Sequence, residues 1–195
     1  MLQPDFFERN TCQVAEDLIG CQLCLVREGQ RIQLAIIETE AYRQDDPACH
    51  AYVGKTKRNE VLFGPPGCLY IYFIYGCHFC MNFVTESEGV GAAVPLRAAA
   101  PVRGESWLRT NRPIPGPAQN LTNGPGKLCQ ALALNRDVNG QPLAPQSGIW
   151  LEQRESEPPI AVGPRIGISK ARDLPWRFGW ANHAYLSAPF KPDQT

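Results

Sequence analysis

Two glutamates, Glu38 and Glu40, are separated by one residue and followed by Tyr42 in a segment typical of a β-strand. Three aliphatic residues of the same parity precede them: Ile32, Leu34 and Ile36. Side chains on a strand alternate between its faces, so the spacing predicts a core-facing row that ends in two carboxylates and a phenol. A carboxylate at such a place can have a raised pKa and act as a general base. The structural alternative, a solvated strand end, is the more common context for a Glu-Thr-Glu pair.

Motifs for several other reaction types are absent from the sequence. The chain has no G-x-S-x-G elbow, no phosphate-binding P-loop, no G-x-G-x-x-G and no H-x-x-x-H pair among its three histidines. Serine hydrolases, nucleoside triphosphatases and dinucleotide-dependent enzymes therefore have no support. The carboxylates, with His50 and a nearby aromatic hairpin, remain as the candidates for chemistry.

Eight cysteines include two C-x-x-C pairs, Cys21 with Cys24 and Cys77 with Cys80. Such pairs can bind zinc, but the gap between them is far longer than the roughly 15–20 residues of compact zinc ribbons. Cys21 also opens a strand-like segment rather than a tight turn. We expect reduced thiols that act as small core residues, without metal; a zinc site is the alternative.

Basic residues are concentrated in one segment. Between Gly89 and Arg136 the only acid is Glu105, against six bases: Arg97, Arg103, Arg109, Arg112, Lys127 and Arg136. Lys55, Lys57 and Arg58 form a second cluster. These side chains could form a phosphate-binding face or be scattered surface charges. A neighbouring tyrosine-rich hairpin favours the first interpretation, because an aromatic turn flanked by bases can insert between base steps of DNA.

Composition limits the class of protein. The chain has 195 residues, of which 44% are hydrophobic and 19% are charged, and its net charge is zero. These figures exclude intrinsic disorder and predict one domain over residues 1–195, with the last few residues frayed. No apolar run reaches the roughly 18–20 residues of a membrane helix, and the first residues lack the pattern of a secretory signal. We expect an intracellular protein that does not enter a membrane.

The remaining pattern predicts short elements joined by many turns. Strands are expected over 21–26, 31–42, 69–75, 79–85, 94–100, 149–152 and 160–168. Helices are expected over 11–20, where Thr11 caps the start, over 102–110 and over 124–134. Residues 43–68 and 111–126 are predicted to be loops. Hairpins with interspersed helices indicate an α+β domain built on antiparallel sheet.

Eight collinear segments resemble the alkyladenine (3-methyladenine) DNA glycosylase family of animals and bacteria. They are Ile37–Tyr42, His50–Tyr52 with Lys57–Asn59, Gly67–Gly76, Cys80–Asn82, Pro95–Arg97, Asn123–Leu132, Arg165–Ile168 and Pro175–Phe178. The likeness runs from about Asp5 to about Leu186. It implies a single compact domain with a mixed, mainly antiparallel sheet, surrounding short helices and a protruding hairpin that enters the DNA minor groove. It also implies excision of alkylated or deaminated purines by base flipping, without metal or organic cofactor.

The same resemblance implies a role for each residue at a matching position. Glu40 stands where the family places its general base, and Arg97 where it places a second ligand of the attacking water. Three side chains match the walls around the flipped base: Tyr42, His50 and Tyr72. Asn82 matches a screen against the 2-amino group of guanine. Tyr75 matches the side chain that fills the gap in the duplex, and Lys127 and Arg58 match phosphate contacts.

Departures from the family pattern lie in the loops. The segment from Tyr42 to His50 and the stretch before Thr56 are each about one residue shorter than in animal members. Cys77 and His78 replace the larger residues expected beside Tyr75. No amine nucleophile lies near the motifs, since Lys55 and Lys57 suit phosphates better, so we expect a monofunctional glycosylase that leaves an abasic site.

Two alternatives differ in class from this interpretation. A non-catalytic module could use the basic face and the hairpin to sense damaged or bent nucleic acid, and a hydrolase could act on free nucleosides. Glu40 argues against the first, because an acid among bases would repel phosphates. The basic segment argues against the second, because a free nucleoside offers no backbone to bind. We therefore expect duplex DNA with damaged purines as the partner of a monomeric protein.

Overall fold

Strand β2 (Gln30–Glu40) is the element around which the sheet is arranged in the computed structural model, which describes residues 1–74, 76 and 78–191. One edge of β2 pairs with β5 (Ala93–Arg103). The other edge pairs first with β1 (Gln22–Arg27) and then, over Glu38–Glu40, with β8 (Arg177–Trp180). The sheet therefore branches at the end of β2 that carries the two glutamates.

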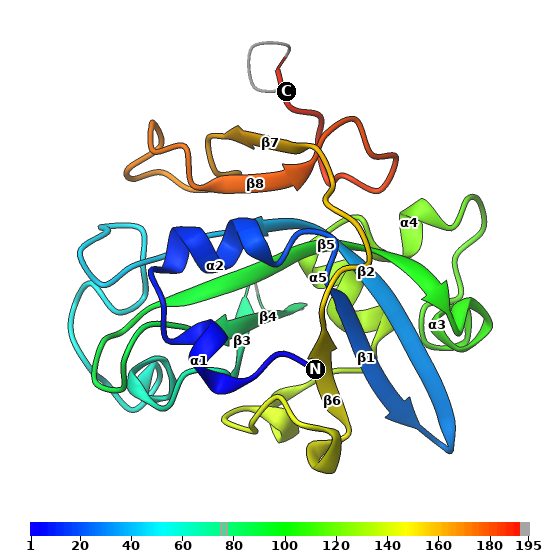
Figure 1. Ribbon diagram of the computed structural model, residues 1–195, viewed down its shortest axis with the longest axis horizontal. Coiled ribbons are helices and arrows are strands. Elements are labelled where there is room, and N and C mark those ends of the chain that lie inside the picture. The colour runs from blue at the N-terminus through cyan, green and yellow to red at the C-terminus, as the bar shows by residue number, and fades with distance from the viewer. Residues whose placement is uncertain (75, 77, 192–195) are drawn as a thin grey trace.

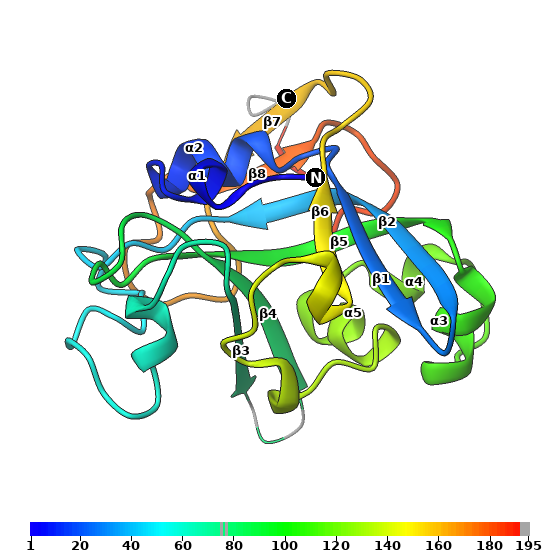
Figure 2. The ribbon, with the colours of Figure 1, turned by 60° about the horizontal axis from the view of Figure 1, so that its bottom comes forward.

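The remaining strands extend the sheet on either side. The order is β3 (Leu69–Ile74), β4 (His78–Val84), β5, β2, β1 and β6 (Ile149–Glu152), while β7 (Ile160–Gly163) pairs with β8. Each pairing among the described strands is antiparallel. The β3–β4 hairpin extends away from the rest of the molecule (Figure 2). This is the predicted α+β architecture with its protruding hairpin.

Short helices cover the sheet. They are α1 (Pro4–Phe7), α2 (Thr11–Asp17), α3 (Glu105–Asn111), α4 (Gln119–Thr122) and α5 (Pro125–Ala131), with 3-10 turns η1 (Glu60–Phe63), η2 (Arg136–Val138) and η3 (Pro145–Ser147). Helix α2 packs against β2, β5 and β8 (Figure 1), and α5 packs against β4 and β5. Leu128, Ala131 and Leu132 of the α5 segment are buried, as the sequence predicts.

A β-bulge in β2 changes which side chains share a face. Ile36 pairs with Ala99 and Glu38 pairs with Ala98, so Ile37 is an extra residue in β2. A bulge of this kind reverses the alternation of side chains beyond it. Ile36 lies in the main core, whereas Ile37 packs on the opposite face. Beyond the bulge it is Thr39 whose hydroxyl donates to the carbonyl of Ala15 in α2, at 2.7 Å.

The predicted continuous row of side chains is therefore wrong. Glu38 and Glu40 lie on the face opposite Ile32, Leu34 and Ile36, and their carboxylates are kept out of the main apolar core. They are nevertheless buried, because β8 and the segment after it cover this second face. Periodicity could not reveal the extra residue, since a bulge needs no special sequence here.

Several predicted element boundaries differ from the structure. The cap of α2 is Asn10, whose side chain accepts from the amide of Cys12, and the helix ends at Asp17. Strand β5 continues to Arg103, so the predicted helix over 102–110 begins only at Glu105. Helix α4 lies within the predicted loop over 111–126, β7 ends at Gly163, and β8 was not predicted. Pairing with β2, of Pro101 with Leu34 and of Arg103 with Gln33, extends β5 to Arg103 despite the weak strand signal of proline.

The apolar core depends on the side chains of the central strands. Phe83 of β4 is fully buried, pairs with Leu69 and Val94, and lies with its ring centroid 6.4 Å from that of Phe7. We expect Phe83→Ala to lower the free energy of unfolding by about 3–5 kcal/mol, measured by urea denaturation. Val102→Ala, at a side chain that is 60% exposed, is the matched control and should change it by less than about 0.5 kcal/mol. Equal losses in the two variants would contradict this packing.

Candidate active site

A cavity of about 330 Å³ opens where β2 ends, beside the β3–β4 hairpin and the start of α5. Its volume lies within the range of small-molecule binding sites. Six of the predicted site residues line it: Glu40, Tyr42, His50, Tyr72, Asn82 and Arg97. Residues from the loop after β7 and from the first turn of α5 complete its wall. The fold thus brings together side chains that are far apart in the sequence.

Glu40 is the only carboxylate that lines this cavity among the described residues, and it is 2% exposed. Its Oε2 accepts a hydrogen bond from the Tyr42 hydroxyl at 3.0 Å, and its Oε1 accepts one from the backbone amide of Ile166 at 2.8 Å. The Nη1 atom of Arg97 lies 3.2 Å from Oε1. Two hydrogen bonds and one ion pair therefore fix the orientation of the carboxylate.

Burial raises the pKa of Glu40, whereas the charge of Arg97 and the hydrogen bonds from Ile166 and Tyr42 lower it. Burial is the largest of these effects, so the pKa of the carboxyl lies above its usual range. A carboxylate of raised pKa binds a proton more strongly than an exposed one does. This is the property required of a general base.

Aromatic side chains form one wall of the cavity. The rings of His50 and Tyr72 meet edge to face with centroids 4.6 Å apart, and Tyr70 stacks on Tyr72 at 5.6 Å. The Nδ1 atom of His50 lies 3.1 Å from the Tyr70 hydroxyl. Desolvation and the positive charge of Arg58 both lower the pKa of His50, so its ring is neutral at pH 7. An uncharged wall of aromatic rings is suited to stacking against a planar base.

Asn82 lines the cavity and is 3% exposed. Its Nδ2 donates to the carbonyl of Tyr70 at 2.9 Å and to that of Cys80 at 3.4 Å. Both hydrogen bonds use the amide nitrogen and are made to the strands of the hairpin. The strands therefore fix the position of the Asn82 side chain beside the aromatic wall.

The guanidinium of Arg165 packs against the face of the Tyr42 ring. Its guanidinium carbon lies 4.4 Å from the centroid of the Tyr42 ring, and Nη1 donates to the carbonyl of Ala41 and pairs with Asp46. Arg165 and Asp46 are both completely buried side chains. Because Ile166 follows Arg165, the same buried pair also positions the amide that binds Glu40.

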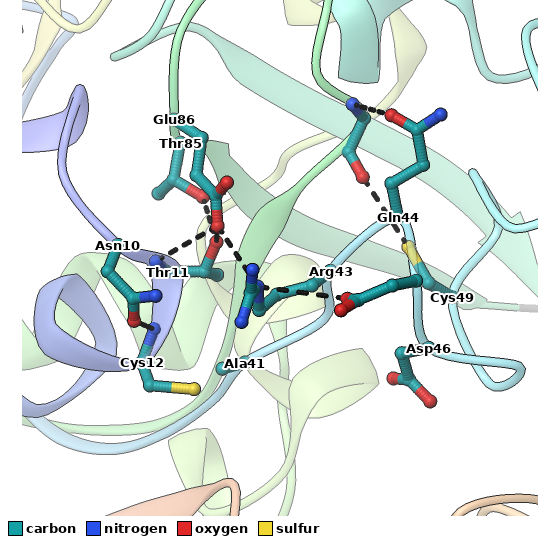
Figure 3. A network of polar contacts seen from close by, with 12 residues as sticks. Asn10, Thr11, Cys12, Ala41, Arg43, Gln44, Asp46, Cys49, Thr85 and Glu86 are labelled. Atoms are coloured by element: carbon teal, nitrogen blue, oxygen red, sulfur yellow. Dashed lines mark hydrogen bonds and ion pairs between the residues drawn. The ribbon is translucent and has the colours of Figure 1, made fainter.

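The loop after β2 is fastened to the turn between β4 and β5. Arg43 pairs with Glu86 at 3.3 Å, and Glu86 also accepts a hydrogen bond from the Thr11 hydroxyl at 2.6 Å (Figure 3). The amide of Gly91 donates to Gln44 at 3.0 Å. A Cβ atom at Gly91 would lie 2.7 Å from Cζ of Phe63, so only glycine allows this close approach. These contacts fix the loop that leads to His50.

Comparisons with known proteins indicate one family. A family model described as "Methylpurine-DNA glycosylase (MPG)" matches residues 5–184. Over 191 residues the chain is 47% identical to a protein of Rhodopseudomonas palustris named "Putative 3-methyladenine DNA glycosylase", which covers 97% of this chain and 92% of the relative. Relatives with the same name come from Carboxydothermus hydrogenoformans, 44% identical, and Nitrosospira multiformis, 43% identical. These two alignments cover 96% and 99% of this chain, and 98% of each relative.

The chain belongs to the methylpurine-DNA glycosylase family. Membership makes it a DNA glycosylase, a hydrolase that acts on alkylated purines in DNA repair, with damaged DNA as its substrate. The resemblance identified from the motifs is thus confirmed. No helix within the described residues is long and apolar enough to cross a membrane.

Two predicted DNA contacts of this family member, Arg58 and Lys127, do not line the cavity. Arg58 is exposed on the loop that follows His50. Lys127, in the first turn of α5, donates to the side chain of Asn123 at 2.8 Å. A Cβ atom at Gly126 would lie 3.0 Å from Cγ of His78, so this turn approaches the base of the hairpin tip. Tyr75 and Cys77 lie outside the described residues.

The described cysteines of the two C-x-x-C pairs lie at β1 and β4, two strands that do not pair with each other. Cys21 and Cys24 are buried at β1, whereas Cys80 is buried in β4 and lines the cavity with Cys49. Residues 1–74, 76 and 78–191 contain no group of three or more Cys, His, Asp or Glu side chains that could hold a metal ion. Burial raises the pKa of the Cys49 thiol to about 11. The thiol therefore stays protonated at neutral pH and presents a small, uncharged surface to the cavity.

Sequence reasoning missed three contributors to the glycosylase site. The amide of Ile166 carries no side-chain signal, and Arg165 was identified only as part of a family segment. Tyr70 was predicted to be in the hairpin, but its bond to His50 depends on how the loop 43–68 folds back. All three depend on long-range packing that local patterns do not encode.

The loop that carries His50 is closed by one buried side chain, Asn59. Its Oδ1 accepts from the amide of Thr56 at 2.6 Å, and its Nδ2 donates to the carbonyls of His50 and Gly54 at 2.8 and 2.9 Å. We expect Asn59→Ala to speed amide hydrogen exchange across residues 50–58 and to cost about 1–3 kcal/mol of stability.

Asn10→Ala, which removes the cap of α2, is the control for this experiment. It should cost about 0.5–2 kcal/mol without changing exchange in residues 50–58. Unchanged exchange in Asn59→Ala would show that the loop does not depend on this side chain.

Proposed function

We propose that this glycosylase binds a damaged purine flipped out of duplex DNA and hydrolyses its N-glycosidic bond with a water molecule activated by Glu40, leaving an abasic site. The observation that carries the proposal is a buried carboxylate in an aromatic-walled cavity, oriented by two hydrogen bonds and by its ion pair with Arg97. The substrate class includes 3-methyladenine and extends to 7-methylguanine, hypoxanthine and ethenoadenine.

For a purine that carries a positive charge after alkylation of a ring nitrogen, the chemistry needs only one carboxylate. Alkylation makes the purine a good leaving group, and departure of the base develops positive charge on the sugar. An ionised Glu40 can stabilise this charge and accept the proton of the attacking water. Glycoside hydrolases use two carboxylates because their leaving groups require protonation. Glu38 does not line the cavity and is not assigned that second role.

Arg97 is the proposed second ligand of the attacking water. Its side chain lines the cavity, and its Nη1 lies 3.2 Å from Glu40 Oε1. A guanidinium N–H so close to the carboxylate can donate to the water oxygen while Glu40 accepts from the water. The two groups together would hold the nucleophile in one place, which lowers the entropic cost of attack.

The walls of the cavity support recognition of a flipped base. Tyr42, His50 and Tyr72 present aromatic surface for stacking, and reading of a flipped base by stacking and by its edge is the common strategy of base-flipping enzymes. Asn82, held by the hairpin strands, is the proposed screen against the 2-amino group of guanine. Arg58 and Lys127 are proposed phosphate contacts.

The glycosidic reaction is tested by removing the charge of Glu40 and keeping its shape. We expect Glu40→Gln to abolish excision from methylated duplex DNA, by at least about 10²-fold, while binding of the damaged duplex is retained. Wild-type protein should release free base with EDTA present and leave alkali-labile sites. Excision by Glu40→Gln within about tenfold of wild type would remove Glu40 from the base role. Binding without excision by the wild type would favour a non-catalytic module.

The pH dependence follows from the same carboxylate. Glu40 must be ionised to act as a base, and burial holds its pKa above the usual carboxyl range. The single-turnover rate should therefore rise with pH through this raised pKa and then level off. The rise should be absent from any residual activity of Glu40→Gln. A rate that is independent of pH from the acid side upward would contradict this assignment.

Tyr75 is the proposed side chain that fills the gap left by the flipped nucleotide. Extrusion costs a few kcal/mol, and a side chain inserted at the gap offsets this cost. We expect Tyr75→Ser to weaken flipping and excision from duplex DNA while the melting temperature changes little. A stability loss of roughly 3–5 kcal/mol would instead mark Tyr75 as a core residue and overturn its assignment as the wedge.

A further inference from the structure

Glu38 is a fully buried carboxylate that does not line the cavity. Its Oε1 accepts from Nε of Arg97 at 2.9 Å, from Nε of Arg177 at 2.8 Å and from the Ser187 hydroxyl at 2.7 Å. Its Oε2 accepts from the amide of Ser187 at 2.6 Å. A carboxylate with four donors, two of them charged, is strongly fixed in place.

The contacts of Arg97 connect this buried group to the cavity. Its Nε binds Glu38 and its Nη2 donates to the Ser187 hydroxyl at 3.3 Å, so two of its nitrogens are held outside the cavity. The third, Nη1, is the one that faces Glu40. Because a guanidinium is planar and rigid, fixing two nitrogens determines the direction of the third.

The segment that supplies Ser187 is itself anchored on the same network. Arg177 donates to the carbonyl of Ala188, and its guanidinium carbon lies 3.9 Å from the centroid of the Phe190 ring. The C-terminal segment thus packs against β8, where a Cβ atom at Gly179 would lie 2.6 Å from Cε2 of Phe190, and it delivers a hydroxyl and an amide to Glu38. Ser187 lies beyond residue 184, the last residue matched by the family model.

We propose that Glu38 and Ser187 are positioning residues that hold Arg97 so that its Nη1 and Glu40 bind one water molecule between them. The inference rests on the proposed function, because it assigns Arg97 a role only in water activation. Neither positioning residue touches the substrate. Their effect on the reaction is exerted entirely through the guanidinium of Arg97.

Charge sharing is a second consequence of the arrangement. Two carboxylates and two guanidinium groups are buried together: Glu38, Glu40, Arg97 and Arg177. Glu38 takes part of the attraction of Arg97 and adds its own negative charge, so both effects keep Glu40 basic. The other polar groups near Glu40 include the Tyr42 hydroxyl and the Ile166 amide, with Arg165 against the Tyr42 ring. The Cys80 thiol of β4 lines the same cavity, and burial, more than the charge of Glu40, raises its pKa.

Removing the charge of Glu38 should therefore lower the pKa of Glu40 and release Arg97 from its fixed orientation. We expect Glu38→Gln to reduce the plateau single-turnover rate on methylated duplex DNA by roughly tenfold to a hundredfold, with unchanged affinity for DNA. The acid limb of its pH–rate profile should move to lower pH, since Glu40 then ionises more readily. A merely structural role would lower stability without moving this limb.

Ser187 provides a milder variant that leaves all four charges in place. Ser187→Ala should lower the plateau rate without a change in DNA affinity, and Ser187→Thr, which keeps a hydroxyl, should recover most of the rate. Thr39→Val is the matched control, because Thr39 makes its buried hydrogen bond to α2 on the opposite face of β2. It should lower stability and leave the rate and its pH profile unchanged. If Glu38→Gln does not fold, the Ser187 pair decides the question.

A measurement without substrate separates this inference from the proposed function. In protein labelled with carbon-13 at glutamate carboxyls, the Glu40 signal is assigned by its loss in Glu40→Gln and titrated by NMR. The pKa of Glu40 should be lower in Glu38→Gln than in wild type. It should also differ from the wild-type value in Ser187→Ala, whereas Thr39→Val should leave it unchanged. An unchanged pKa together with unchanged plateau rates would overturn the positioning role. Absence of excision by wild-type protein would overturn only the proposed function.

Discussion

The burial of the Glu40 carboxylate next to the charge of Arg97 is the interaction on which the arrangement of this protein depends. An ionised carboxylate away from water is costly unless charges and donors compensate it. Here Arg97, the Tyr42 hydroxyl and the Ile166 amide provide that compensation from three parts of the chain. Arg97 in turn forms an ion pair with Glu38, and Glu38 also forms an ion pair with Arg177. The site is thus a balanced buried network rather than one residue in a pocket.

The fold is organised to make this network possible. The bulge at Ile37 directs both glutamates to the face opposite the main apolar core. Strand β8 pairs with β2 over Glu38–Glu40, the stretch that carries these two glutamates. The β3–β4 hairpin and the loop fastened to the 85–91 turn then place the aromatic wall in the same cavity as the carboxylate. A site built on strands in this way holds its geometry better than one built on free loops.

Much of this could be predicted from the sequence, because some of its signals are local. The aromatic hairpin of β3 and β4 follows from residue type alone. Glu40 and the wall residues were identified from motifs and do line one cavity. The bulge, β8 and the amide of Ile166 could not be predicted, because each depends on pairing between distant segments. The sequence correctly predicts that Glu38 is buried, but it places Glu38 on the face of Ile36 rather than on the opposite face of β2.

The most direct test of the central claim is a crystal structure of the Glu40→Gln variant bound to duplex DNA that carries a damaged purine. The account predicts the damaged base in the cavity between Tyr42 and His50. It also predicts one water molecule within hydrogen-bond distance of both the side chain at position 40 and the guanidinium of Arg97, facing the glycosidic carbon. A base that remains stacked in the duplex, or a water molecule held away from these two side chains, would contradict it.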